Sequence, residues 1–303
     1  MGRYLIRRLV WGVFTLWGLA SVVFLLLRLF PGGPFDDDLA VFPQVKLALE
    51  KAYHLSGSPV DQYFDFLNSC LHGDLGVSVF YPGETVAHLI TRGFATTAAM
   101  NLSAVLMLIL ISLCMALVVH LYPRSAPAIR QLEKIGIALP NLFLAPLLIW
   151  LLCFETSVFP LRANGTIYSL ILPIFLLAFR PACSLARILD LKIAENLRQD
   201  FARTHLAQGV SDFRLVWRWC LRSCLPTFLQ QLPILGASLL SGSLLIDMLF
   251  SIQGLGSYFT GSLLNRDWGL SLGLALFFGV MLVVLQIVSD ALMMILDPRV
   301  RVA

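Results

Sequence analysis

Six long apolar runs dominate the sequence and restrict it to one class of fold. The first, from Leu9 to Leu27, contains no charged residue, and about 20 apolar residues are needed for a helix to cross a bilayer. The other runs are centred on residues 98–121, 135–154, 167–186, 225–246 and 269–294. Only 13% of the residues are charged, whereas a soluble domain carries about a quarter. The sequence therefore predicts an all-α polytopic membrane protein with six transmembrane helices.

The basic residues are distributed between the loops in a pattern that predicts orientation. One side of the predicted bundle carries Arg3, Arg7, Arg8, Arg124, Arg130, Lys134, Arg187, Lys192, Arg198, Arg203, Arg214, Arg218, Arg222, Arg299 and Arg301. The other side carries only Lys46, Lys51, Arg92, Arg162 and Arg266. Because cytoplasmic loops are enriched in Lys and Arg, we expect both termini in the cytoplasm. The net charge of +4 then reflects topology, and we expect the lipid bilayer rather than a nucleic acid as a partner.

The segment 31–93 is expected to form a small extracytoplasmic cap. It follows an N-terminal segment 1–30 with the first helix, and it precedes a five-helix core at 94–303. His72 and Asp74 lie close together in this cap, but two candidate ligands in a turn are weak evidence for a metal. The six cysteines also lack the spacing of a zinc site. We expect no metal, no cofactor and no disulfide.

The segment 187–226 is the longest polar interruption after the first hundred residues. Seven of the 22 Lys and Arg residues lie in it. Ser211 and Asp212 are typical of a helix start, and Arg214 begins a series of arginines at four-residue spacing on one helical face. Gly209 precedes this helix and tolerates positive φ, so two short helices are expected to meet there at an angle. Spacing alone leaves two roles open, an interfacial helix on anionic lipid or a docking site for a protein.

A resemblance to a known family favours the docking role. The string Arg203-Thr-His-Leu-Ala-Gln-Gly209, followed by Leu225-Pro226, resembles the cytoplasmic coupling loop of peptide/nickel-type ABC importer permeases. The chain is also similar to that family in Arg28-Leu-Phe-Pro-Gly-Gly-Pro34, Gly73-Asp-Leu-Gly-Val-Ser78, Gly254-Leu-Gly256 and Asp297-Pro-Arg299. The resemblance implies the type I ABC importer permease fold, with a coupling helix-turn-helix in the segment 187–226. It also implies that Arg203, Thr204, His205, Ala207, Gln208, Gly209 and Arg214 contact the ATPase.

The same resemblance implies a set of partners. The chain would be a non-enzymatic transporter subunit of the bacterial inner membrane, paired with a second homologous permease. Two cytoplasmic ATP-binding subunits and an extracytoplasmic substrate-binding protein would complete the importer. The sequence itself contains no Gly-x-x-x-x-Gly-Lys-Ser/Thr loop that could bind the phosphates of ATP. Bulk at Gly209 is expected to block the turn and uncouple the ATPase from transport.

The sequence leaves alternatives open for both the substrate and the class of protein. Peptides are the default substrate, and nickel or another non-peptide solute remains open. An ion- or proton-coupled secondary carrier is the runner-up, although it gives no explanation for the long basic segment. A membrane enzyme ranks third, because the sequence shows no catalytic cluster.

Three charged residues, Arg180, Asp247 and Asp290, fall inside predicted spans. Each would cost at least about 2.5–3.5 kcal/mol in hydrocarbon, so each needs a partner or a polar surrounding. They could form structural pairs or lie near the headgroups. Alternatively they could line a translocation path, together with Ser243. Asp247 and Asp290 match acidic positions of the resembled family, and we hypothesise that Asp247 lines the outer part of such a path.

Overall fold

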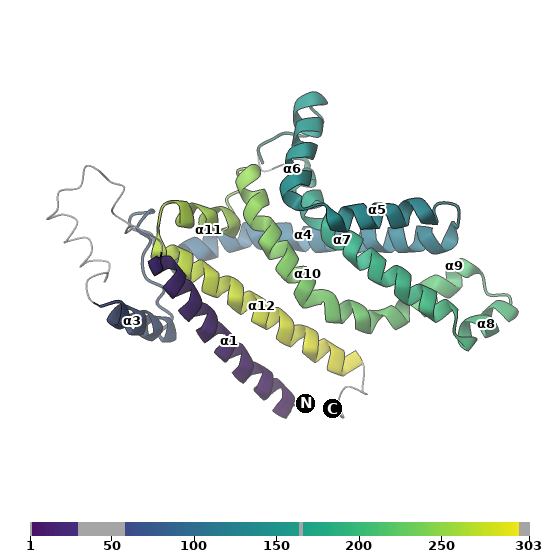
Figure 1. Cartoon of the computed structure of the whole chain (residues 1–303), viewed down its shortest axis with the longest axis horizontal. Helices are drawn as coiled ribbons and strands as arrows, with labels where there is room; N and C mark the ends of the chain where they lie inside the picture. Colours follow the sequence, from purple (N-terminus) through teal and green to yellow (C-terminus); the bar gives the residue numbers. More distant parts are fainter. Residues whose placement is uncertain (1, 30–57, 164–165, 297–303) are drawn as a thin grey trace. The chain divides into compact units, whose positions relative to one another are not determined.

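The computed structural model describes residues 2–29, 58–163 and 166–296, and these residues are mainly helical (Figure 1). The helices are α1 (Gly2–Leu29), α3 (Pro59–Leu71), α4 (Val86–Leu121), α5 (Ala126–Ala138), α6 (Asn141–Ile149), η1 (Trp150–Glu155), α7 (Ile167–Leu197), α8 (Asp200–Ala207), α9 (Asp212–Arg214), η2 (Leu215–Cys220), α10 (Leu221–Leu249), α11 (Leu255–Leu264) and α12 (Trp268–Leu296). Both η1 and η2 are π-helical. Contacts divide the chain into two compact units. Among the described residues, unit 1 contains 98–163, 166–252 and 285–296, and unit 2 contains 2–29, 58–97 and 253–284.

The helices confirm the prediction of an all-α polytopic membrane protein. Among the described residues, five helices are long and apolar enough to cross a membrane: Ile6–Leu29, Val86–Leu121, Ile167–Leu197, Asp212–Leu249 and Trp268–Ile295. The pair formed by α5 and the segment Asn141–Glu155 would provide a sixth span, with a bend of 106° between its two parts. The sequence predicts three consecutive parts with boundaries at residues 30 and 93, whereas the two units are defined by contacts and combine separate parts of the chain. Much of the predicted cap lies outside the described residues.

The predicted helix at 135–154, with Pro140 and Pro146 as possible bends, is broken into two helices at Pro140. The chain leaves the helical conformation at Leu139, where ψ is 115°, and begins α6 only after Pro140. A residue before proline is pushed out of the α region, and this preference explains the position of the break. Arg130 and Lys134, predicted in a loop, lie within α5 instead.

The segment 187–226 is helical on both sides of Gly209, as predicted, but its boundaries with the membrane spans differ from the prediction. Because no Gly or Pro lies between Arg187 and Leu197, α7 continues without a break to Leu197. Pro226, predicted at the start of a span, lies inside α10. The predicted loop 251–268 contains the short helix α11, which sequence reasoning missed.

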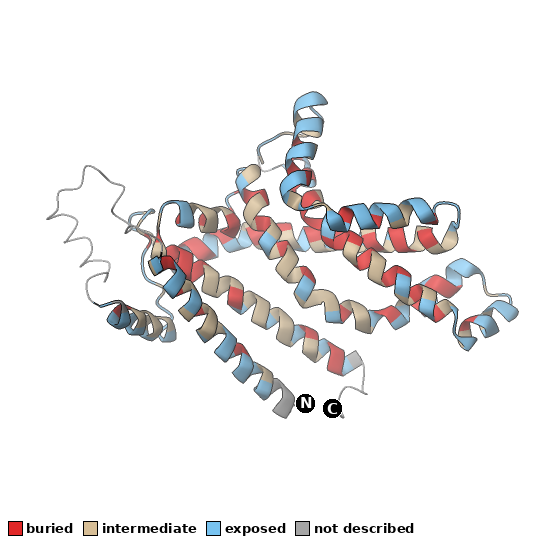
Figure 2. Ribbon diagram, viewed as in Figure 1, coloured by how far each residue is buried: buried red, intermediate tan, exposed pale blue. Residues whose placement is uncertain are grey.

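Unit 1 is built around α7. Its side chains are buried on most sides, and Figure 2 shows this helix as one of the most deeply buried parts of the unit. Leu176, Leu177 and Leu185 are at most 1% exposed and belong to one cluster with residues of α4, α6 and α10. The segment that leaves this helix toward α8 is therefore held by the core of the unit.

Unit 2 packs α1, α11 and the first part of α4 around the start of α12. Val86, Leu255 and Leu270 form its centre and are fully buried. Glycines allow close approach of helices here, since a Cβ at Gly12 would lie 2.7 Å from a methyl of Val283 on α12. The opposite face of α1 exposes large apolar residues such as Trp11, as expected for a helix in contact with lipid.

Candidate functional site

The segment 200–220, which we call the elbow, joins α7 to α10 in unit 1. It consists of α8, a turn at Gly209, the single helical turn α9 and the π-helix η2. Gly209 has a φ of 81°, and the N–H groups of Gly209 and Val210 donate to the carbonyls of Leu206 and His205 at 3.0 and 3.1 Å. These bonds satisfy the last carbonyls of α8, as is typical of a helix that ends on a left-handed glycine. The predicted turn at Gly209 and the short helix before it are confirmed, whereas the helix after it is not short but begins the long helix Asp212–Leu249.

Two details of the elbow differ from the sequence-based expectations. Ser211 is the N-cap residue of α9, but its side chain makes no capping hydrogen bond. A Cβ at Gly209 would meet no atom within 4 Å, so bulk alone would not block the turn. The constraint at Gly209 is its positive φ, which side chains with a Cβ rarely adopt.

The inner side of the elbow is anchored to the core of unit 1. Ala202 and Cys220 are fully buried. The side-chain amide of Asn196, at the end of α7, donates to the Ser223 hydroxyl at 2.7 Å and lies 3.4 Å from the Cys220 carbonyl oxygen. The His205 ring stacks on Trp219 with centroids 4.3 Å apart, and this contact joins α8 to η2. The elbow is therefore held at both of its arms.

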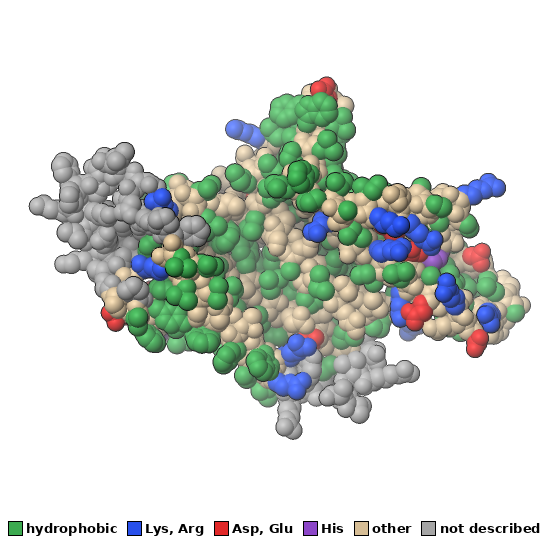
Figure 3. Space-filling model, viewed as in Figure 1, with side chains coloured by type: hydrophobic (Ala, Val, Ile, Leu, Met, Phe, Trp, Pro, Cys, Tyr) green, Lys and Arg blue, Asp and Glu red, His purple; other side chains and the backbone are tan. Residues whose placement is uncertain are grey.

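The outer side of the elbow presents aromatic and charged groups to solvent. Phe213 and Trp217 are exposed and stack with their ring planes 5° apart. Basic side chains, with acidic ones among them, gather over the end of unit 1 that carries α8 and α9 (Figure 3). Of the predicted ATPase-contacting residues, the exposed ones are Arg203, Thr204, Ala207, Gln208, Gly209 and Arg214, whereas His205 is half-buried against Trp219. Exposed Trp and Arg side chains on a fixed backbone are typical of protein interfaces.

A buried charge network lies beside the part of α7 that leads to the elbow. Arg130 of α5 donates two hydrogen bonds to the Asp190 carboxylate, and the His120 Nε2 of α4 lies 3.1 Å from the same carboxylate. Arg187 lies 3.4 Å from Asp190 and 3.9 Å from the buried Glu133. The network connects three helices through one carboxylate. Sequence reasoning missed this network because it assigned Arg130 to a loop. The available signal was Asp190 itself, an acid in a basic stretch, because such an acid needs a partner when it is buried.

The four candidate path residues lie on three helices, α7, α10 and α12. Asp247 and Ser243 lie one turn apart on α10, both 1% exposed, and the Ser243 hydroxyl donates to the Leu240 carbonyl. Asp290 accepts a hydrogen bond from Gln286 on its own helix at 3.2 Å. Arg180 is exposed, with its Nε 3.5 Å from the carbonyl oxygen of Ile137. The contact of Arg180 is a structural one, and the path role of all four residues stays a prediction.

A second buried carboxylate organises unit 2. Asp267 precedes α12 and accepts hydrogen bonds from the N–H groups of Val79, Phe80 and Leu270 at 3.0–3.1 Å, and from the hydroxyl of Ser78. The segment Gly73–Ser78, which resembles a family motif, is thus joined to the start of α12 by the hydrogen bond from the Ser78 hydroxyl to Asp267. Sequence reasoning missed Asp267, although an acid just before an apolar helix is a typical N-cap signal.

His72 and Asp74, considered above as metal ligands, have local partners. The His72 Nδ1 lies 2.8 Å from the Asn68 carbonyl oxygen at the end of α3. Asp74 accepts from the N–H of Gly76 at 2.9 Å. No group of three or more His, Cys, Asp and Glu residues within 2–29, 58–163 and 166–296 could hold a metal ion.

Comparison with known proteins decides the family. A family model described as "Binding-protein-dependent transport system inner membrane component" matches residues 109–302, a range that includes the elbow and the Asp190 network. The chain belongs to this family. It is therefore a membrane-spanning subunit of an ABC importer, located in the inner membrane with several spans, and it is not itself an enzyme. Such importers also contain ATP-binding and substrate-binding proteins.

Full-length relatives support the same assignment. The chain is 30% identical to a dipeptide transport system permease protein of Bacillus subtilis, over 99% of this chain and 98% of the relative. It is 28% identical to an oligopeptide transport system permease protein of Salmonella typhimurium, and 28% identical to a dipeptide transport system permease protein of Lactococcus lactis. Each of the last two alignments covers 99% of this chain and 100% of the relative. The similarity to these permeases thus includes unit 2 as well as the family core.

Proposed function

We propose that this chain forms, with a second and related permease, the translocation path of an ABC importer for peptides. The substrate class rests on its relatives, which are named dipeptide and oligopeptide permeases and match the chain over nearly its whole length. The pairing with a second permease rests on the family resemblance. In this arrangement two cytoplasmic ATP-binding subunits supply the energy, and an external binding protein delivers the peptide.

The elbow is the docking site for one ATP-binding subunit in this proposal. Arg203, Thr204, His205, Ala207, Gln208, Gly209 and Arg214 form or position the contact. The observation that carries the proposal is the two-sided character of the elbow. Its inner side is fixed by Asn196 and by the ring pair of His205 and Trp219, whereas Phe213 and Trp217 are exposed.

A fixed elbow can transmit force to the membrane helices. When the ATP-binding subunits close, the elbow moves with them, and its attachment to α7 and α10 shifts these helices as rigid elements. The Asp190 network passes the same displacement to α4 and α5. The importer then alternates between outward- and inward-open states because ATP stabilises one set of these contacts over the other.

The orientation and the path follow from the same proposal. Both termini and the elbow face the cytoplasm, as the distribution of Lys and Arg predicts. Asp247 lines the outer part of the path, with Ser243 on the same helical face and with Asp290 and Arg180 as further candidates. In a peptide-uptake assay, Asp247→Asn should reduce uptake at unchanged expression, and unchanged uptake would remove Asp247 from the path.

One experiment tests the proposed function as a whole. The tagged chain, purified from its native membranes in mild detergent, should retain the second permease and an ATPase. The turnover of this ATPase should rise when the binding protein and a dipeptide are added together. An ATPase that is absent, or that ignores the binding protein, would contradict the proposal. Labelling of a cysteine introduced at the exposed Gln208 of the elbow by a membrane-impermeant reagent in intact cells would contradict the orientation.

A further inference from the structure

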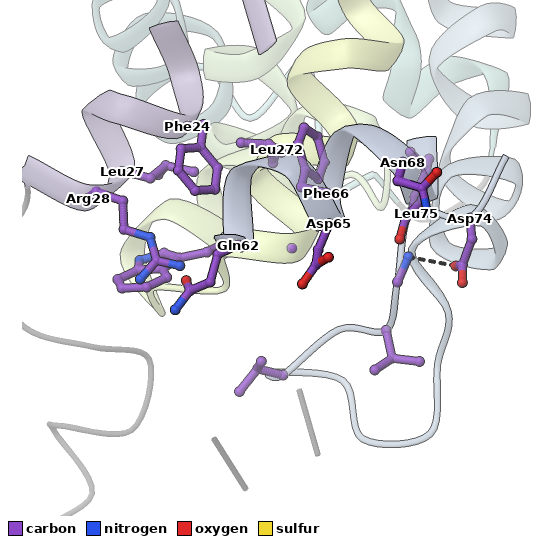
Figure 4. Close-up of a pocket in the computed structure, with 16 residues that line it drawn as sticks. Phe24, Leu27, Arg28, Gln62, Asp65, Phe66, Asn68, Asp74, Leu75 and Leu272 are labelled. Carbon is purple, nitrogen blue, oxygen red and sulfur yellow. Dashed lines mark hydrogen bonds between the residues drawn. The ribbon is translucent and has the colours of Figure 1, made fainter. Parts of the chain in front are cut away.

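A cavity of about 580 Å³ lies within unit 2, between the end of α1, α3, the turn after α3 and the start of α12 (Figure 4). Its floor is apolar and includes Phe24, Leu27 and Leu272. Its rim is polar and carries a cation and two carboxylates. The rim and the floor together have the character of a site for an amphiphile, and this inference does not depend on the transport role proposed above.

The charged groups of the rim are separated along the cavity. Figure 4 shows Arg28 and Gln62 at one end and Asn68 and Asp74 at the other, with Asp65 between them. The Arg28 guanidinium lies over the ring of Trp268 at 4.4 Å, and this stacking holds it at the rim. Asp65 is exposed, so its carboxylate is available to a ligand. A bound molecule would meet positive charge at one end and negative charge along the rest.

The position of the cavity points to the bilayer as the source of its ligand. Arg28 lies at the end of the span Ile6–Leu29, and Trp268 begins the span Trp268–Ile295. Trp and Arg at the ends of spans lie at the level of the lipid headgroups. The apolar floor then lies at the edge of the hydrocarbon, where the acyl chains of a lipid begin.

We propose that this cavity binds one phospholipid whose headgroup carries both a phosphate and a primary ammonium, as in phosphatidylethanolamine. The phosphate accepts hydrogen bonds from Arg28, whose planar guanidinium suits two phosphate oxygens. The ammonium has three N–H donors and lies toward Asp65 and Asp74. The first part of an acyl chain, next to the headgroup, packs on Phe24, Leu27 and Leu272. Phosphatidylcholine has the same charges but no ammonium N–H, so it binds less tightly.

Trp268 provides a native reporter for this site. The full-length chain is reconstituted in phosphatidylcholine vesicles that contain, at equal mole fraction, brominated phosphatidylethanolamine or brominated phosphatidylcholine with the same acyl chains. Bromine quenches tryptophan fluorescence only at short range. We expect stronger quenching by the ethanolamine lipid, and we expect Trp268→Phe to remove the difference between the two lipids.

Variants of the rim separate the two contacts. Arg28→Gln should weaken association of the ethanolamine lipid roughly tenfold, the effect of losing about 1.4 kcal/mol from charge-assisted hydrogen bonds. Arg28→Lys should weaken the association less than Arg28→Gln, because it keeps the charge but loses the paired guanidinium donors, and this order distinguishes lost charge from misfolding. Asp65→Asn should reduce the preference over phosphatidylcholine without abolishing lipid association. Arg92→Gln, a matched control on an exposed arginine of unit 2 outside the cavity, should behave as the unaltered chain.

Two results would overturn the proposal. Equal quenching by both lipids, or an association of the ethanolamine lipid that Arg28→Gln leaves unchanged, would show that the cavity does not recognise this headgroup. Displacement of the brominated ethanolamine lipid by an added dipeptide would identify the cavity as a site for substrate instead.

Discussion

Arg130 donates two hydrogen bonds to the Asp190 carboxylate, one from Nε at 3.0 Å and one from a terminal guanidinium nitrogen at 3.2 Å. This pair connects α5 to α7 at the point where α7 leaves the membrane span for the elbow. Asp190 is only 2% exposed, so its charge relies on these partners rather than on water. The pair therefore fixes the direction in which α7 reaches the elbow.

Removing this carboxylate should destabilise the chain. Asp190→Ala deprives Arg130 and the partly buried His120 of their shared acceptor. We expect a loss of about 1–3 kcal/mol in the free energy of unfolding, with the lower end favoured because Arg130 is half exposed. A thermal melt of the purified chain in detergent measures it. Asp200→Ala, at an exposed carboxylate on α8, is the control, and equal melting temperatures for the two variants would contradict the prediction.

Substitutions at Gly209 should depend on backbone conformation rather than on size. With a φ of 81° and open space around it, this position accepts a side chain only at a conformational cost of about 1–2 kcal/mol or more. Gly209→Val should therefore insert normally but lose most peptide uptake. Gly209→Asn should retain more uptake, because asparagine tolerates positive φ. Uptake is measured at matched membrane levels, and equal uptake by both variants would refute this explanation.

The pattern of the sequence predicted the membrane spans and the turn at Gly209 because both are local properties. Charge-free apolar runs and a glycine between two polar helices have few alternative readings. The sequence marks Pro140 as a possible bend but does not show that the helix ends there, since prolines at 146, 173, 181, 226 and 233 lie inside helices of the same chain. In membrane helices neighbouring groups can satisfy the freed carbonyls, so a proline alone does not mark an end.

The partners of the buried charges could not be predicted from the sequence. Asp190 and Arg130 are far apart along the chain, and so are Asp267 and Ser78. Only the packing of the helices brings each pair together. The sequence does show that an acid in an apolar setting needs a partner, but it does not show which basic or N–H group supplies it.

The ring contact between His205 and Trp219 should stiffen the elbow. His205→Ala removes the stack that joins α8 to η2, and we expect the stimulation of the ATPase by the loaded binding protein to fall a few-fold. His205→Phe keeps a ring in the same place and should retain most of the stimulation. If the two variants are equally impaired, the imidazole itself rather than the stack is required.

Loss of the Asp267 carboxylate should loosen the turn before α4. Asp267→Asn replaces an acceptor of four hydrogen bonds by a group with only one acceptor oxygen, so at least one buried N–H loses its partner. Ser78→Ala removes one of the four donors and should have a smaller effect. The melting temperature should therefore be highest for the unaltered chain, lower for Ser78→Ala and lowest for Asp267→Asn. The reverse order for the two variants would contradict the role of Asp267.

Cys70 on α3 should react slowly with alkylating reagents in the folded chain. Burial, with a further contribution from Asp74, raises the pKa of its thiol to about 11. Because the thiolate is the nucleophile, the alkylation rate should increase about tenfold per pH unit above pH 7.5 and level off only near that pKa. Peptide mapping by mass spectrometry isolates Cys70 from the other cysteines, and the denatured chain provides the reference. A folded-state rate equal to the denatured-state rate at pH 7.5 would show that the thiol is not shielded.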